Sequence, residues 1–164
     1  MQLLRTLIGL LFAAHGAQKL FGWFGGGGPA GTGEMFESMG LSPGKRNALA
    51  AGAAETGGGA LIAADIGKPL AAAALSGSMV TAVRHAHLPK GLWNHEGGYE
   101  YNLVLLAGIF AIVAEDDGLP WAIGALAAGA AGSFATTALA EREAETVEEE
   151  AVVREAPRVV APVT

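Results

Sequence analysis

The sequence predicts an all-α protein: a transmembrane four-helix bundle with a possible fifth apolar helix and a disordered acidic C-terminal tail. Hydrophobic residues make up 51% of the 164 residues and only 16% are charged, whereas about a quarter is typical of soluble domains. Four stretches come close to the roughly 20 residues that cross a hydrocarbon layer of about 30 Å. Their few polar residues lie at similar depth instead of being scattered, and ionisable groups inside a membrane are by default a functional site.

The first predicted helix covers Leu3–Trp23. We interpret it as a retained span and not a signal peptide. Glycines and a lysine-bearing polar face accompany its end, and no small-residue cleavage site of the A-x-A type follows it. It ends at the aromatic pair Trp23–Phe24 and the helix-breaking run Gly25–Gly28. A long polar loop is expected up to residue 47. The second helix covers Ala48–Ile66, and its many alanines and glycines allow close helix approach.

The third predicted helix, Pro69–His87, follows a tight turn at Asp65–Lys68, because Pro69 suits a first helical position. The fourth, Gly98–Ala114, is stopped by three acidic residues at 115–117. The connections are long, short and long, so the first and third loops share one side of the membrane. The N-terminus and the Asp65–Lys68 turn share the other side. Lysines and arginines on both sides leave the orientation undecided.

The C-terminal region does not follow the plan of the first 118 residues. Residues 119–140 are apolar and long enough to span, and both a fifth span and a loosely packed interfacial helix remain open. Residues 141–164 lack apolar periodicity, so we expect a disordered tail that can begin as helix. The sequence therefore divides into 1–118, 119–140 and 141–164.

The net charge of −6 arises mainly in that tail, so it says little about the core, and no nucleic-acid partner is expected. The chain contains no cysteine. Disulfides, iron–sulfur clusters and CxxCH haem attachment are thereby excluded within this chain. Any redox chemistry needs another cofactor or a partner subunit.

A set of polar residues from all four predicted spans falls in the half of the bilayer nearest the long loops, whereas the other half offers little besides Ser76 and Ser78. The set consists of His15, Gln18, Lys19, Glu55, Arg84, His85, Glu100 and Asn102. The first three have i, i+3, i+4 spacing, which places them on one helix face. We expect one pocket that opens toward the long loops.

Glu55 and Lys19 carry opposite charges at compatible depth. A structural ion pair that fixes helix register is one interpretation. The other is that Glu55, acting with His15, moves protons or hydrogen-bonds a quinone head group. For His15, donation to a backbone carbonyl of a neighbouring helix remains open as well. A haem between His15 and His85 is conceivable but disfavoured, and no metal site is expected because no HxxxH spacing occurs.

Three strings resemble, in order, the signatures of the DoxX family: LFAAHGAQKLFGWFGGGG at Leu11–Gly28, GAAETGGGALI at Gly52–Ile62 and HLPKGLWNHEGGYEYNLVLL at His87–Leu106. The resemblance covers Leu3–Ala114. It implies a small four-helix integral membrane protein of a prokaryote, in a family linked to a terminal quinol oxidase, to thiosulfate:quinone oxidoreductase and to complexes that handle oxidative and thiol stress. The family-type polar residues would be His15, Lys19, Glu55, His87, Glu96, Tyr99 and Glu100.

The expected function is a quinone-linked redox subunit of a respiratory or oxidative-stress complex, multi-pass in the cell membrane. Glu55 and His15 are the candidate catalytic residues. The candidate cofactor-binding residues are Lys19, Gln18, His85, His87 and Glu100. The expected partners are the lipid bilayer and a redox protein subunit, and the chain could form an oligomer. The alternatives are a non-enzymatic scaffold for a redox complex and, third, a small transporter.

Overall fold

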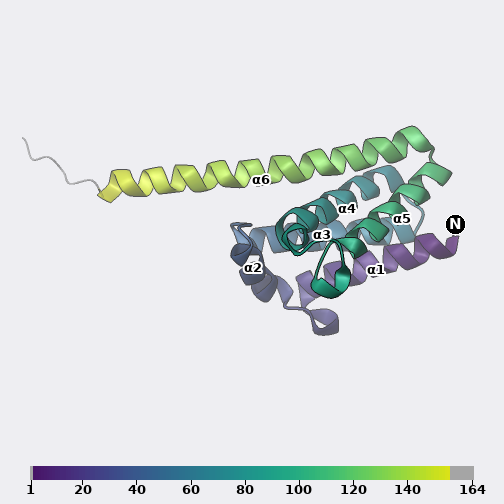
Figure 1. The fold of residues 1–164 in the computed structure, drawn as a ribbon, viewed down its shortest axis with the longest axis horizontal. Coiled ribbons are helices and arrows are strands. Elements are labelled where there is room, and N and C mark those ends of the chain that lie inside the picture. Colours follow the sequence, from purple (N-terminus) through teal and green to yellow (C-terminus); the bar gives the residue numbers. More distant parts are fainter. Residues whose placement is uncertain (1, 156–164) are drawn as a thin grey trace, which may run out of the picture.

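The computed structural model describes residues 2–155, with side chains placed for residues 2–142, 145 and 146. Every regular element in this range is helical, which confirms the all-α class. The helices are α1 (Gln2–Phe21), α2 (Gly28–Ser38), α3 (Gly44–Ala63), α4 (Lys68–Ala82), α5 (Glu100–Asp116) and α6 (Leu119–Glu155). Short turns of helix occur at η1 (Trp23–Gly25), η2 (Val83–His87), η3 (Leu88–Lys90) and η4 (Asn94–Glu96). Figure 1 shows α1, α3, α4 and α5 gathered in a bundle, with α6 along its outer edge.

The segment expected to be a loop between the first two spans contains α2. Pro29 occupies its first turn, where the missing proline N–H costs no helical hydrogen bond. This segment contains many glycines, and because glycine has a low helix propensity the sequence did not predict a helix here. At the end of α2, the Glu37 Oε1 accepts a hydrogen bond of 3.1 Å from Gly44 N at the start of α3. This contact ties α2 to α3 at one end of the bundle (Figure 1).

The α-helix expected to reach His87 ends instead at Ala82 and continues as the π-helical turn Val83–His87. Pro89 lacks the N–H that would continue the α-helical hydrogen-bond ladder. Helix α3 also begins at Gly44, four residues before the expected start, and ends at Ala63. Its end is closed by Asp65, whose φ of 65° lies in the left-handed region that aspartate tolerates better than most residues.

The interior of the bundle is filled by large apolar side chains. Phe12, Ile62, Leu75, Ile109 and Ile112 are almost fully buried. Large apolar side chains also point outward from the long helices, including Leu3, Leu7 and Leu10 of α1, Leu103 and Val104 of α5, and Trp121, Ile123 and Phe134 of α6. So much exposed apolar surface is unusual for a soluble monomer. Judged by length and mean hydropathy alone, the segment Leu119–Arg142 qualifies as a membrane span.

Helices α1 and α3 approach so closely that glycine is required at their contact. A Cβ on Gly59 would lie 2.5 Å from the Gly9 carbonyl oxygen, and a Cβ on Gly16 would lie 2.6 Å from the Gly52 carbonyl oxygen. Real Cβ atoms do not approach a backbone so closely. These glycines therefore bring the two backbones together and place Lys19 of α1 within reach of Glu55 of α3.

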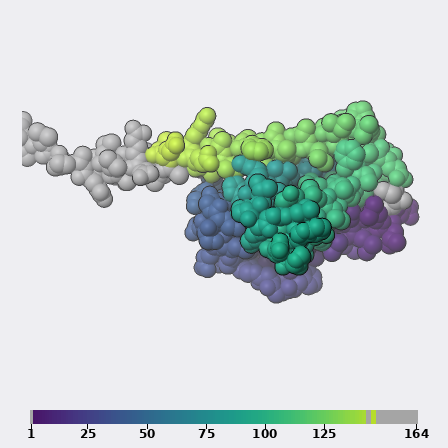
Figure 2. Space-filling view, viewed as in Figure 1, coloured from purple at the N-terminus to yellow at the C-terminus, as the bar shows by residue number. Residues whose placement is uncertain are grey.

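Helix α6 is continuous from Leu119 to Glu155, which corrects the expected disorder for residues 141–155. Residues 156–164 lie outside the described range. At 1.5 Å per residue its 37 residues extend over about 55 Å. It packs along α4 and α5 and then runs on past the end of the bundle where α2 lies, as Figures 1 and 2 show. The contact with α4 is tight, because a Cβ on Gly129 would lie 2.7 Å from Gly77 N.

Candidate functional site

The ion pair expected between the first two spans is present. Lys19 Nζ donates to Glu55 Oε2 at 2.5 Å. The Glu55 side chain is only 2% exposed, whereas that of Lys19 is 19% exposed. The lysine therefore connects a buried carboxylate with the outside of the bundle.

The second oxygen of Glu55 has a partner that sequence reasoning did not assign to the site. Ser78 Oγ of α4 donates to Glu55 Oε1 at 2.5 Å. By its expected depth, Ser78 belongs to the other half of the bilayer, away from the predicted polar pocket. The signal that could have found it is its distance of about two turns from Arg84 along the same helix. The group Lys19, Glu55 and Ser78 thus joins α1, α3 and α4, and both carboxylate oxygens carry a hydrogen bond.

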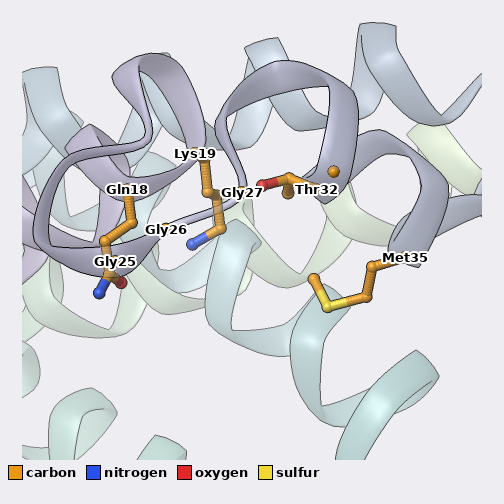
Figure 3. A pocket seen from close by; sticks show the side chains of 8 residues that line it. Gln18, Lys19, Gly25, Gly26, Gly27, Thr32 and Met35 are labelled. Carbon is orange, nitrogen blue, oxygen red and sulfur yellow. The ribbon is translucent and has the colours of Figure 1, made fainter.

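A cavity of about 420 Å³ opens beside Lys19, where the turn after α1 meets α2. Its lining consists of Gln18, Lys19, Gly25, Gly26, Gly27, Gly31, Thr32 and Met35. In Figure 3, Lys19 extends from α1 between Gln18 on one side and the α2 residues Thr32 and Met35 on the other. The Gln18 amide also donates to the Phe24 carbonyl at 3.4 Å. The cavity volume lies within the usual range for small-molecule sites, about 300–1,000 Å³.

The ammonium of Lys19 offers more hydrogen bonds than its described partners use. It carries three N–H donors, of which one is directed to Glu55 and one makes a long contact of 3.5 Å with the His15 carbonyl. One donor remains for a ligand in the cavity. Glu55 does not line the cavity, so Lys19 is the charged group that a ligand would meet first.

His15 lies on α1 one turn before Lys19 but faces a different neighbour. Its Nδ1 donates to the Leu11 carbonyl of its own helix at 2.9 Å, where a carbonyl of a neighbouring helix was one expected partner. Its ring centroid lies 6.3 Å from that of Tyr101 on α5. With Nδ1 as the donor, the neutral ring keeps Nε2 as a proton acceptor.

The remaining residues expected in the pocket are divided between two other places. His87 Nδ1 donates to the Gly97 carbonyl at 2.7 Å, and Glu100 Oε2 accepts from Asn94 N at 3.0 Å. Both contacts fold the loop between α4 and α5 onto itself. Among the hydrogen bonds of the described residues, none links His87 or Glu100 to Lys19 or Glu55.

Arg84 is directed to α6 instead of the predicted pocket. Its Nη1 donates to Ser133 O and Ser133 Oγ, both at 3.3 Å, and to Thr137 Oγ1 at 3.4 Å. Its guanidinium carbon lies 3.8 Å from the centroid of the Phe134 ring. His85 follows it in the π-helical turn, and its Nε2 is buried without a hydrogen-bond partner in the described part of the chain. Within the same part, no group of three metal-ligating side chains comes together.

A second charged cluster closes the opposite end of the bundle. Asp65 lies in the turn between α3 and α4 and contacts Arg5 at 3.0 Å and Lys68 at 2.5 Å. Arg5 also reaches Asp116 at the end of α5, at 3.4 Å. The hydrogen bond from the Lys68 ammonium holds the pKa of Asp65 below its ordinary value, and the charge of Arg5 adds to this effect. The cluster fastens the start of α1 to the ends of α3 and α5.

A family model described as DoxX matches residues 1–88, which is more than half of the chain. The matched range contains Lys19, Glu55 and Ser78, whereas α5 and α6 lie beyond it. Comparisons with curated proteins and with solved structures found no match.

Proposed function

The chain belongs to the DoxX family, which is a family of membrane proteins, and on that premise we propose that it is a quinone-linked redox subunit of a cell-membrane complex. The observation that carries this proposal is the cavity of about 420 Å³ beside an ammonium group with an unused donor. A quinone head group offers two carbonyl oxygens that accept hydrogen bonds, and the Lys19 ammonium and Gln18 amide are donors at the cavity wall. The residues present therefore fit such a ligand.

The chain's own residues would hold the head group and manage its protons. A bound quinone would supply the electron-accepting chemistry that a chain without cysteine lacks. Lys19 Nζ would donate to a ligand oxygen while Glu55 Oε2 balances its charge in a medium of low dielectric. If Lys19 Nζ passed a proton to a ligand oxygen, water would have to replace it, and the 19% exposed lysine side chain has access to water. The Glu55 carboxylate, 2.5 Å away, would favour the return of the ammonium. Ser78 Oγ would keep the Glu55 carboxylate in position. The partner subunit would supply the electrons.

The same helices support a five-span arrangement in the bilayer. Helices α1 and α3 each have 20 residues and are therefore about 30 Å long, which matches a hydrocarbon layer. Helix α4 reaches this length together with η2, and α5 is slightly shorter. Helix α6 crosses back beside α4, so its acidic end would leave the membrane on the side of α2. The N-terminus and the C-terminal extension would then lie on opposite sides.

Quinone binding to the purified full chain tests the redox proposal. We expect the protein in nanodiscs to bind a short-chain ubiquinone or menaquinone analogue. Loss of a charge-assisted hydrogen bond is worth about 1.5–3 kcal/mol, so Lys19→Met should weaken binding at least tenfold. Lys90→Met removes an exposed lysine on the same side of the bundle and should leave binding unchanged. If the unmodified protein has no affinity for either analogue, the proposal is wrong.

One observation favours a second candidate, a non-enzymatic scaffold in a redox complex. Both oxygens of Glu55 are already satisfied by Lys19 and Ser78, as a purely structural ion pair requires. A native pull-down from membranes separates the two functions. A scaffold should retain its partners when Lys19→Met and Glu55→Gln are combined, and its complex should keep full activity. A quinone-binding subunit should keep its partners but lose quinone reduction.

A further inference from the structure

Arg84 is a partly buried cation. No carboxylate among the described residues balances its charge. Its partners among the described residues are all neutral: the Ser133 carbonyl, the Ser133 and Thr137 hydroxyls and the Phe134 ring. No carboxylate of the described residues forms an ion pair with Arg84, and the buried Glu55 is paired with Lys19 instead. A lone guanidinium in a membrane-spanning bundle costs several kcal/mol unless an anion or water reaches it.

One edge of the guanidinium is held by hydrogen bonds, and the other edge donates none to the described residues. Its hydrogen bonds to described residues all come from Nη1, and the face of Phe134 fixes the plane of the group. The N–H groups on Nε and Nη2 therefore have no protein acceptor in this part of the chain. Planar guanidinium donors match the oxygens of a phosphate, which accept two parallel hydrogen bonds.

The depth of Arg84 in the bilayer places its guanidinium within reach of the lipid headgroups. Ser133 and Thr137 lie 14 and 18 residues after Leu119, or about 21 and 27 Å along α6. In a hydrocarbon layer of about 30 Å, their side chains fall within about 10 Å of the rim next to the long loops. An arginine can extend over that distance toward the interface. Phe134 is 56% exposed, so this part of the α4–α6 seam faces the surroundings of the bundle.

From these observations we propose that Arg84, held in place by Ser133, Phe134 and Thr137, binds the phosphate of an anionic phospholipid. The site goes beyond the proposed quinone function, because it lies on α4 and α6 and shares no residue with the cavity beside Lys19. The lipid phosphate supplies the counter-charge that the described protein residues do not. It also links α6, which lies outside the matched family range, to the rest of the bundle.

The test compares full-length protein in phosphatidylcholine nanodiscs with and without phosphatidylglycerol. Native mass spectrometry should show the protein released with bound phosphatidylglycerol in preference to phosphatidylcholine. Arg84→Gln should reduce this preference roughly fivefold, which is the scale of one basic residue at an anionic membrane surface. Lys90→Gln removes an exposed loop cation on the same side and should leave it intact. Equal retention of the two lipids by the unmodified protein, or an unchanged preference in Arg84→Gln, would overturn the proposal.

Two further measurements keep the proposal testable. A photoactivatable anionic lipid should label residues 81–88 and 130–137 of the unmodified protein, so the outcome does not depend on whether Arg84→Gln folds. Labelling confined to other segments would contradict the site. Inorganic phosphate added to phosphatidylcholine nanodiscs should not raise the thermal midpoint. If it protects as well as phosphatidylglycerol does, the ligand is free phosphate and the lipid assignment is wrong.

Discussion

The ion pair between Lys19 Nζ and Glu55 Oε2 spans 2.5 Å, but its two members differ in their access to solvent: the glutamate side chain is 2% exposed and the lysine 19%. This asymmetry determines the cost of removing either partner. A Glu55 carboxylate without Lys19 stays buried with only Ser78 to compensate it. A Lys19 ammonium without Glu55 can still reach the cavity.

We therefore expect Lys19→Met to lower the free energy of unfolding by about 3–5 kcal/mol, because it leaves an uncompensated buried charge. Glu55→Gln should cost less, about 1–2 kcal/mol. The double variant should recover most of the loss, since neither charge remains. Unfolding of the three variants in detergent measures the cycle. Additive losses in the double variant would show that the two side chains do not interact.

Ser76 and Ser78 lie on the same helix and provide a matched pair. Ser78 Oγ donates to Glu55, whereas Ser76 Oγ is buried with no hydrogen-bond partner in the described part of the chain. Ser78→Ala should lower the free energy of unfolding by about 1–3 kcal/mol, because Glu55 loses a donor. Ser76→Ala should be neutral or slightly stabilising. Equal effects in thermal unfolding would contradict the geometry at Glu55.

Gly57 and Gly59 test the close approach of α1 and α3. A Cβ on Gly59 would collide with the backbone of α1, but one on Gly57 would meet no atom within 4 Å. Gly59→Ala should therefore destabilise the bundle by about 1–3 kcal/mol through overpacking. Gly57→Ala should stabilise it by roughly 0.5–1 kcal/mol, the difference in helix propensity. Thermal midpoints of the two variants should move in opposite directions, and a shared direction would argue against the packing.

The charged cluster at the other end of the bundle should depend on pH. The pKa of Asp65 is lowered from 3.8, chiefly by the hydrogen bond from Lys68. A depressed carboxyl pKa stabilises the fold above the unfolded pKa, and this contribution is lost as the pH falls through the folded pKa. Asp65→Asn should therefore lower the thermal midpoint at pH 7.

The difference between Asp65→Asn and the unmodified protein should shrink once the pH falls below 3.8. Glu115→Gln is the control, because Glu115 is exposed and forms no ion pair with the described residues. Its midpoint should follow that of the unmodified protein at every pH. A constant difference for Asp65→Asn down to the lowest pH measured would refute the linkage.

The five-span arrangement can be tested with single cysteines, because the chain contains none. Lys90→Cys and Glu145→Cys should react with a membrane-impermeant thiol reagent from the same side of intact vesicles. Ile66→Cys, in the turn between α3 and α4, should react only from the other side. If the cysteines at 66 and 145 react from one side together, α6 does not cross the bilayer.

The sequence by itself determined the order of the four main apolar helices, because long apolar runs bounded by glycine, proline and aromatic residues leave few other choices. It also offered the pairing of Lys19 with Glu55 as one of two interpretations, because the two residues carry opposite charges at compatible depth. The sequence did not predict α2, because glycines weaken helix propensity along this segment. It did not predict the continuous α6, because the change from apolar to acidic composition near residue 141 resembles a helix end.

The tertiary structure alone decided which polar residues meet. Spacing along a helix gives depth, but the direction of a side chain depends on the rotation of each helix against its neighbours. That rotation is set by the glycine contacts between α1 and α3 and between α4 and α6. It brings Ser78 to Glu55, aims Arg84 at α6 and leaves His87 and Glu100 in the loop. Packing between helices is a property of pairs of surfaces, so no single stretch of sequence contains it.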